Sequence, residues 1–440
     1  MAFTLFNFHS LQGKKGGFKD TRPEELLAGI LRAVYQKVNL DPSLIEDISV
    51  GNVLPPGGGA NGARMAALHA GIPVATPIAT VNRQCSSGLT AVNLIAAQIT
   101  SGQIDIGIGT ELDASFSLAH SSSRDWLCAG AGVESMTFGF GPASLPDGWS
   151  DVVLTTKEAE DCLIPMGVTS ENVAEDYGIT RAQQDAFAAK SFQKAAVAAK
   201  AGRFRAEIAP LTVKWVDPKT EQVKEITVSA DDGIRDGVTA EGLSKLKPAF
   251  KKNGSTHAGN ASQVSDGAAA VLLARRSTAR RLGLPIVGKF VSAAVVGVPP
   301  RVMGIGPAYA IPKVLKQTGL KSEDIDFFEI NEAFASQAVY SIEKLGLPYE
   351  KVNLNGGAIA IGHPLGMSEF FTSALRTAEE RLFDYSSPLF FFYNSRCASD
   401  CYWLEHCKAD RKAHLCDEHV CRFGHGYGCR IRERALSECK

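Results

Sequence analysis

Two segments of the chain carry residues that could act together as a nucleophile and a base. In the first, Cys85 follows Val-Asn-Arg-Gln and precedes Ser-Ser-Gly and an apolar stretch, so it lies where a helix is expected to begin. Backbone N–H groups at the start of a helix favour a thiolate. In the second, His363 lies in Gly-His-Pro-Leu-Gly, and a distant imidazole could deprotonate the thiol. These residue types indicate nucleophilic catalysis by a cysteine.

A third polar residue, Asn331, directly follows the apolar run at residues 327–330 and precedes an Ala-rich segment. It therefore lies at the carboxyl end of an expected strand, where α/β sheets tend to bind ligands. Simpler interpretations exist for all three residues. A cysteine before an apolar helix is often a small buried hydrophobic residue, a histidine in a Gly/Pro turn is often a solvated loop residue, and Asn331 could be a plain helix cap.

The segments around Cys85 and His363 resemble the thiolase family almost residue for residue, most strongly the peroxisomal type of 3-ketoacyl-CoA thiolase. The resemblance covers about residues 17–109 and 131–366. Further matching blocks occur in the same order along the chain: Gly-Gly-Phe-Lys-Asp, Gly-Asn-Val-Leu, Pro-Met-Gly-Val-Thr-Ser-Glu-Asn-Val-Ala, Gly-Asn-Ala-Ser-Gln-Val-Ser-Asp-Gly-Ala-Ala-Ala and Glu-Ile-Asn-Glu-Ala-Phe-Ala. So many specific blocks in order argue against coincidence.

The resemblance implies a role for each matching residue. Cys85 matches the cysteine that carries the acyl thioester, and His363 matches the histidine that activates it and donates a hydrogen bond to the thioester oxygen. Asn331 matches the residue that holds a water in the first oxyanion hole, whereas its neighbour Glu332 is expected to be structural. Residues expected to line the coenzyme A and acyl pocket are Ser262, Met166 and Gly357. Coenzyme A is a substrate here; no cofactor and no metal is implied.

The expected reaction is thiolysis of a 3-ketoacyl thioester, which needs a thiolate, a base, donors for two oxyanions and an acid for the departing enolate. Thiolases take the acid and one donor from a Cys-x-Gly motif near the end of the chain. No Cys-x-Gly occurs between residues 367 and 440, and Cys128-Ala-Gly lies far from the place of that motif. A second catalytic cysteine is therefore not found, and we expect turnover to be impaired.

Short β-branched runs alternate with helical apolar periodicity along residues 24–335, which predicts an α/β chain. The resemblance implies a five-layer αβαβα core of two similar halves with an inserted loop domain. We assign residues 1–138 and 259–280 to the N-terminal half, 139–258 to the loop domain, 281–366 to a truncated, incomplete C-terminal half, and 367–440 to a Cys-rich tail outside the family. Residues 182–201 are expected to form an exposed amphipathic helix.

Three stretches depart from the family. Residues 3–15 show neither the first strand nor the Arg-Thr-Pro turn of thiolases, so we expect an edge strand to be missing. Residues 110–130 interrupt a segment that should run from Gly109 directly into Ala131. After Gly366 the family sequence ends abruptly, although residues 367–385 have a helix-forming composition and residues 388–393 could form a strand. Retained intron or out-of-frame sequence would begin and end in this abrupt way, which comparison of transcript with genome would test.

Seven of the ten cysteines lie after residue 396, interleaved with four histidines, but their irregular spacing does not fit a zinc site. The formal net charge of −1 gives no field for nucleic acid, and no run of about 18 apolar residues predicts a membrane span. The expected partners are 3-ketoacyl-CoA, CoA and a second copy of the chain, in a homodimer or homotetramer. The resemblance implies the peroxisome, with the cytoplasm as the alternative, because no targeting signal is identified.

Two other functions remain open. The missing Cys-x-Gly favours a catalytically inactive thiolase-like chain that binds CoA or pairs with intact subunits. A ketoacyl-synthase-type condensing enzyme would also carry a Cys/His/Asn set, but such synthases lack Asn-Glu-Ala-Phe together with Gly-Gly-Ala-Ile-Ala-Ile-Gly-His-Pro. A condensation that depends on a malonyl thioester would identify the synthase.

Overall fold

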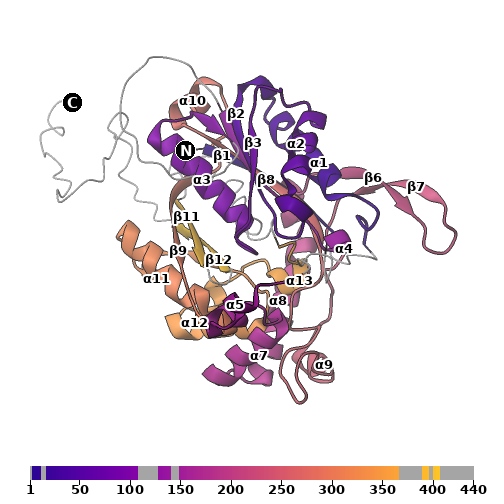
Figure 1. Cartoon of the computed structure of the whole chain (residues 1–440), viewed down its shortest axis with the longest axis vertical. Helices are drawn as coiled ribbons and strands as arrows, with labels where there is room; N and C mark the ends of the chain where they lie inside the picture. Colours follow the sequence, from indigo (N-terminus) through magenta and orange to yellow (C-terminus); the bar gives the residue numbers. More distant parts are fainter. Residues whose placement is uncertain are drawn as a thin grey trace, which may run out of the picture. The chain divides into compact units, whose positions relative to one another are not determined.

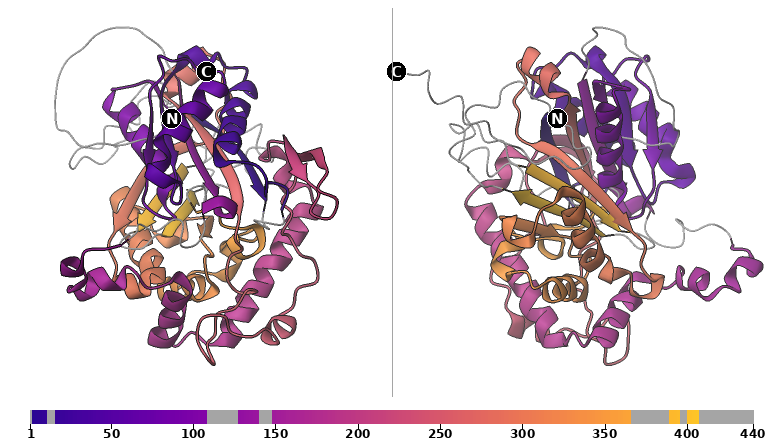
Figure 2. Two further views of the ribbon diagram at one scale, coloured as in Figure 1. Left: turned by 45° about the vertical axis from the view of Figure 1, so that its right-hand side comes forward. Right: turned by 90° about the vertical axis from the view of Figure 1, so that its left-hand side faces the viewer.

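The computed structural model describes residues 2–10, 16–107, 127–139, 148–365, 389–395 and 400–406 (Figures 1 and 2). The strands are β1 Ala2–Ser10, β2 Ile45–Gly51, β3 Ile78–Val81, β4 Ile106–Gly107, β5 Leu127–Ser135, β6 Leu211–Val216, β7 Val223–Val228, β8 Asp266–Ala274, β9 Lys289–Val296, β10 Phe327–Ile330, β11 Leu389–Ser395 and β12 Asp400–His406. The α-helices are α1 Pro23–Gln36, α2 Ala60–His69, α3 Ser87–Ser101, α4 Met136–Gly139, α5 Asp151–Leu154, α6 Lys157–Asp161, α7 Met166–Tyr177, α8 Arg181–Lys200, α9 Ala240–Ser244, α10 Arg276–Arg281, α11 Gly306–Thr318, α12 Ala335–Leu345 and α13 Ala358–Ile361. The predicted α/β class is confirmed.

The first sheet has the strand order β1-β8-β5-β2-β3, and β4 also pairs with β8. Strand β2 runs parallel to β3 and β5, whereas β8 is antiparallel to β5 and β1. The carboxyl ends of β2, β3 and β5 therefore meet at the edge of the sheet where β8 begins. This edge is the one at which α/β sheets present loop residues to a ligand.

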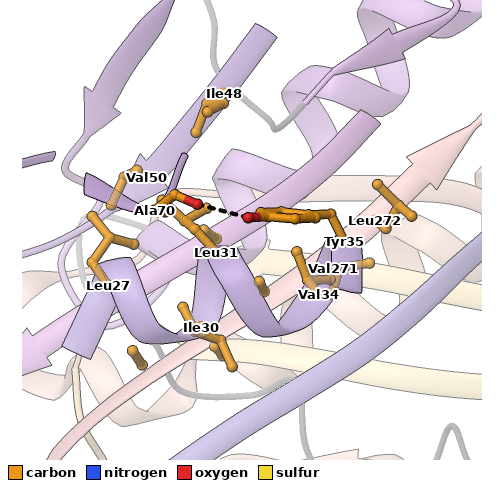
Figure 3. Close-up of a cluster of buried hydrophobic side chains, with 14 of the residues drawn as sticks. Leu27, Ile30, Leu31, Val34, Tyr35, Ile48, Val50, Ala70, Val271 and Leu272 are labelled. Carbon is orange, nitrogen blue, oxygen red and sulfur yellow. Dashed lines mark hydrogen bonds between the residues drawn. The ribbon is translucent and has the colours of Figure 1, made fainter. Parts of the chain in front are cut away.

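Helix α1 shows why this half folds as it does (Figure 3). Leu27, Ile30, Leu31 and Val34 recur at helical spacing, are fully buried, and belong to the same core as residues of β2 and β8. Burial of each such side chain contributes about 1.5–3 kcal/mol relative to exposure. Tyr35 is buried at the end of the helix, where its hydroxyl donates to the carbonyl of Ala70 at 2.8 Å.

The expectation that an edge strand is missing from the N-terminus is wrong. Strand β1 pairs antiparallel with β8 along its whole length, from Ala2 opposite Ala274 to Ser10 opposite Asp266. The segment Ala-Phe-Thr-Leu-Phe-Asn-Phe is rich in residues that favour strands, and β8 offers it an edge. Absence of the family motif at residues 3–15 therefore does not mean absence of the strand.

The expected insertion, residues 110–130, separates β4 from most of β5, and both strands pair antiparallel with β8. Ile106 and Gly107 of β4 pair with Ala274 and Leu273 of β8, and Ala131 of β5 pairs with Ala270. Only two positions of β8 lie between these pairs, and Ala129 and Gly130, at the end of residues 110–130, pair with them. Residues 108 and 109 would fill the same two positions if they ran directly into Ala131.

The second sheet has the order β10-β12-β11-β9, with β11 parallel to β9 and β12 antiparallel to both its neighbours. Figure 2 shows β11 and β12, in yellow, as its two central strands. The strand expected at residues 388–393 is confirmed as β11. Strand-forming sequence thus continues past the expected boundary at residue 366. The helix expected at residues 367–385 and the Cys-rich segment after residue 406 lie outside the described residues.

Helix α3 contacts β2 and β5 of the first sheet and β9 and β11 of the second, and α11 contacts β9, β11 and β12. The helix expected at residues 182–201 is confirmed as α8, which begins with a capping box between Thr180 and Gln183. One side of α8 is buried, however, and not exposed as a free amphipathic helix would be. Ala188, Phe192, Ala195 and Ala198 pack in one core with α13. Among the described residues, no helix is long and apolar enough to cross a membrane.

Candidate active site

Cys85 lies in a tight turn between β3 and α3, as the sequence predicts. The preceding residue, Gln84, adopts a left-handed backbone conformation with φ 50°, which is uncommon outside glycine. Ser87 closes the turn, because its hydroxyl donates to the Gln84 carbonyl at 2.5 Å and accepts from the Arg83 N–H at 2.8 Å. Cys85 is 9% exposed, is not part of a disulfide bond, and lies just before the first turn of the helix.

A close backbone approach fixes this turn on the sheet. A Cβ added to Gly51, the last residue of β2, would lie 2.3 Å from the backbone nitrogen of Gly88 in the first turn of α3. A glycine is therefore needed at position 51, where strand and helix touch. This contact holds the thiol at the carboxyl edge of the first sheet.

Asn331 and His363 are brought together, although 32 residues separate them. Asn331 directly follows β10, and its Nδ2 lies 3.4 Å from Nε2 of His363. Helix α12 begins only at Ala335, with Phe334 at the N-cap position, so the interpretation of Asn331 as a helix cap is wrong. The residue before His363, Gly362, has φ 94° and ψ 168°, a conformation that essentially only glycine adopts.

Ser265 joins His363 to the edge at which Cys85 lies. The backbone N–H of His363 donates to the Ser265 hydroxyl at 3.1 Å. Ser265 immediately precedes β8, whose first residue, Asp266, pairs with Ser135 at the carboxyl end of β5. Because β2, β3 and β5 are parallel, the ends of these strands, the turn of Cys85 and the loop of His363 share one edge of the first sheet.

Burial sets the protonation state of His363. The side chain is 2% exposed, and burial lowers the pKa of its imidazole to about 4. The ring is therefore neutral at pH 7 and can accept a proton, as a base for a thiol must. Nδ1 is buried and has no hydrogen-bond partner among the described residues. A buried ring nitrogen without a hydrogen-bond partner lowers the stability of a fold, so its presence at this position indicates a functional role for the histidine.

The predicted pocket residues Ser262 and Met166 are each connected, Ser262 directly and Met166 through contacts of neighbouring residues, to the loop that follows Asn331. Ser262 is half-buried, and its N–H donates to the carbonyl of Ala333, two residues from Asn331. Met166 begins α7 and is 43% exposed. The next residue, Gly167, packs against Phe250, whose ring meets the Phe334 ring edge-on at 6.4 Å. These contacts lead from Met166 to the Asn331 loop; a role in binding CoA stays a prediction.

Gly357, which the sequence predicts to line the coenzyme A and acyl pocket, packs closely against Glu332. A Cβ at this position would lie 2.4 Å from Cδ of Glu332, so a glycine is required where the loop crosses that side chain. Glu332 is fully buried and accepts from Ser191, Asn353 and Ile359. Sequence reasoning missed Ser191, Asn353 and Ser265. For Ser265 a signal existed, because it lies within a block that matches the thiolase family.

Comparison with known proteins agrees with this fold. Two family models match: the thiolase N-terminal domain at residues 9–277 and the thiolase C-terminal domain at residues 284–378. The peroxisomal 3-ketoacyl-CoA thiolase B of Rattus norvegicus is 58% identical over 352 residues, which are 80% of this chain and 77% of the relative. The dimeric peroxisomal thiolase of Saccharomyces cerevisiae superimposes with a TM-score of 0.76 and 42% identity, covering 92% of this chain and 97% of that one.

A second structure of the yeast protein, with a TM-score of 0.66 and 38% identity over 92% of this chain and 98% of that one, is described as five-layered and built from two core domains of identical topology. The chain belongs to the thiolase family, and its fold is the five-layer αβαβα fold. The resemblance that the sequence motifs indicate is thereby confirmed, as is membership of an acyltransferase class.

Proposed function

We propose that this protein is a 3-ketoacyl-CoA thiolase, which uses CoA to cleave 3-ketoacyl-CoA into acetyl-CoA and a shortened acyl-CoA in fatty-acid β-oxidation. The observation that carries the proposal is the neutral His363 beside Asn331, at the sheet edge where Cys85 lies in the turn before α3. The relatives named as peroxisomal 3-ketoacyl-CoA thiolases support the choice of substrate.

The chemistry follows from these three residues. His363 accepts the thiol proton, and the Cys85 thiolate attacks the keto carbon of the substrate. The bond between the second and third acyl carbons then breaks, the shortened acyl group stays on Cys85 as a thioester, and acetyl-CoA leaves as an enolate that takes up a proton. CoA next attacks the thioester and releases Cys85. Asn331 would hold a water that stabilises the oxyanion.

We propose further that turnover of this chain is impaired. The family's Cys-x-Gly motif supplies the acid for the enolate and one oxyanion donor, and residues 367–440 contain no such motif. Loss of a general acid costs about 10²- to 10⁴-fold in rate, and loss of an oxyanion donor about 10²- to 10³-fold. The same absence favours a second candidate function, an inactive thiolase-like protein that binds CoA or pairs with intact subunits.

The remaining features of the proposal concern assembly and location. A structural relative is described as a dimeric peroxisomal thiolase, which supports a homodimer, with a homotetramer as the alternative. The names of the similar proteins support the peroxisome over the cytoplasm. Size-exclusion chromatography with light scattering measures the oligomeric state. Imaging of the tagged chain in cells shows its location.

The test of the proposed function measures acetyl-CoA by mass spectrometry after the purified protein is mixed with a 3-ketoacyl-CoA and CoA. We expect slow formation of acetyl-CoA that disappears in Cys85→Ala and falls strongly in His363→Ala. Formation that is equal in the wild type and in Cys85→Ala would reject the proposed nucleophile. Turnover at the rate of an intact thiolase assayed in parallel would reject the impairment alone.

A further inference from the structure

Glu332 is a buried carboxylate whose hydrogen-bond partners in the described part of the chain are all donors. It is 1% exposed. Its Oε2 accepts from the Ser191 hydroxyl at 2.6 Å and from the Ile359 N–H at 3.2 Å, and its Oε1 accepts from Nδ2 of Asn353 at 2.6 Å. Burial raises the pKa of Glu332, whereas the three hydrogen bonds and Lys194, on the same face of α8 as Ser191, act in the opposite direction.

These contacts join the two segments that carry Asn331 and His363. Glu332 is the residue after Asn331 in the chain. Ile359, which it binds, lies in α13, and α13 leads through Gly362 directly into His363. Glu332 thus holds together the two loops whose side chains approach to 3.4 Å between Asn331 Nδ2 and His363 Nε2.

Asn353 cannot turn to suit a different partner. Its Oδ1 accepts from the N–H of Ile330 at 2.7 Å, and its Nδ2 donates to the carbonyl of Ile330 at 2.8 Å. This pair of bonds to one residue fixes which end of the amide faces Glu332. Nδ2 therefore requires an acceptor at that point.

The loop before His363 is packed too tightly to move independently. A Cβ on Gly356, which has φ +80°, would lie 2.5 Å from the backbone carbonyl oxygen of Ser191 in α8. The N–H of Gly357 donates to the Ser191 hydroxyl at 3.0 Å. Ser191 therefore binds the loop and Glu332 at once, and α8 forms the base on which this part of the site rests.

We propose that Glu332 is a positioning residue that sets the distance between Asn331 and His363 and thereby the rate at which Cys85 is activated. The inference rests on the proposed function of these residues. Glu332 is separated from solvent by α8 and the loop, and it contacts the polar groups named above, so it acts through its neighbours and does not touch substrate.

The main variant is Glu332→Gln, which keeps the shape of the side chain. Since all three partners are donors, the new amide nitrogen must face either Asn353 or the pair Ser191 and Ile359, and at least one buried bond is lost. The matched control is Glu46→Gln, a carboxylate at the opposite end of β2 that accepts from the N–H groups of Asp105 and Ile106 at 2.8 and 2.9 Å.

The first readout is acylation of Cys85 by a 3-ketoacyl-CoA, followed by intact mass over time. We expect Glu332→Gln to lower the rate constant at saturating substrate at least tenfold, because a displacement of about 1 Å in a site can cost about 10²-fold. The substrate concentration for half-saturation should stay within twofold of the wild type, and Glu46→Gln should match the wild type in both values. Equal rate constants for Glu332→Gln and the wild type would overturn the proposal.

The second readout needs no substrate and therefore separates this proposal from the proposed function. Alkylation of Cys85 by iodoacetamide, located by peptide mass spectrometry, depends on the thiolate that His363 helps to form. We expect at least fivefold slower alkylation at pH 7 in Glu332→Gln and none of this effect in Glu46→Gln. Unchanged alkylation in Glu332→Gln overturns the positioning role. A wild type that alkylates but forms no acyl-enzyme contradicts only the proposed substrate.

A double variant guards against a general loss of structure. In Glu332→Gln with Asn353→Asp, the carboxylate and the amide exchange places, so the new amide at position 332 can donate to the new carboxylate at position 353. We expect the double variant to regain at least threefold in alkylation rate over Glu332→Gln alone, with the Ile330 carbonyl losing its donor. A double variant no faster than the single one, with an unchanged melting temperature in both, would contradict the role assigned to this bond.

Discussion

The buried, neutral His363 should make the stability of the protein depend on pH in a way that one substitution removes. Burial lowers the pKa of His363 from 6.5 to about 4. Between these two values the unfolded chain binds a proton at this position and the folded chain does not. Stability due to this residue is therefore complete above pH 6.5 and is lost as the pH falls towards 4.

The size of the effect follows from the difference between the two pKa values. One pKa unit corresponds to about 1.4 kcal/mol, so a shift from 6.5 to about 4 corresponds to about 3 kcal/mol. In His363→Asn this dependence is absent. The other groups with shifted pKa values, such as Asp266 and His257, are present in both proteins and cancel in the comparison.

The assay is urea unfolding of the wild type and of His363→Asn at pH 7, 6, 5 and 4. We expect the free energy of unfolding of the wild type to fall by about 3 kcal/mol more than that of the variant between pH 7 and pH 4. A difference between the two proteins that stays constant across this range would refute the buried, neutral state of His363. It would also remove the argument that His363 is ready to act as a base at pH 7.

Two other substitutions test how the site is held, and one deletion tests the register of the first sheet. Gly51→Ala should destabilise the fold by about 1–3 kcal/mol, because the new Cβ would lie 2.3 Å from a backbone atom. The control Gly62→Ala in α2 has no contact closer than 4.0 Å and should be neutral or stabilising. Equal melting temperatures for the two variants would contradict the close approach at Gly51. Ser265→Ala removes the acceptor of the His363 N–H, so it should lower the free energy of unfolding by about 1–3 kcal/mol and slow the acylation of Cys85. Urea unfolding measures the first effect and intact mass the second. Unaltered values in both assays would contradict the role of Ser265. Deletion of residues 110–130 joins Gly109 to Ala131 in the existing register of β8, so we expect a melting temperature at or above that of the full chain, and a clear decrease would disprove the register argument.

The sequence predicts those parts of the site that depend on neighbouring residues. The turn that places Cys85 before α3 and the position of Asn331 after β10 follow from local patterns of apolar and small residues. The family and the five-layer fold follow from motifs that keep their order along the chain. These predictions need no knowledge of which distant segments pack together.

The remaining features depend on contacts between distant residues. Ser191 and Glu332 are 141 residues apart, and Ser265 and His363 are 98 apart, so no local pattern connects them. The buried side of α8 could not be predicted because its many alanines suit either a packed or a solvated face. Strand β1 was missed for a different reason: the family motif was absent, while the strand-forming residues were present.

The central claim, that Cys85 is the nucleophile of an acyl transfer, is tested most directly by intact mass of the purified protein after incubation with acetoacetyl-CoA. The account predicts a mass increase of one acetyl group, located on Cys85 by peptide mapping and absent from Cys85→Ala. A folded wild type that gains no mass, or a Cys85→Ala variant that gains the same mass, would contradict it.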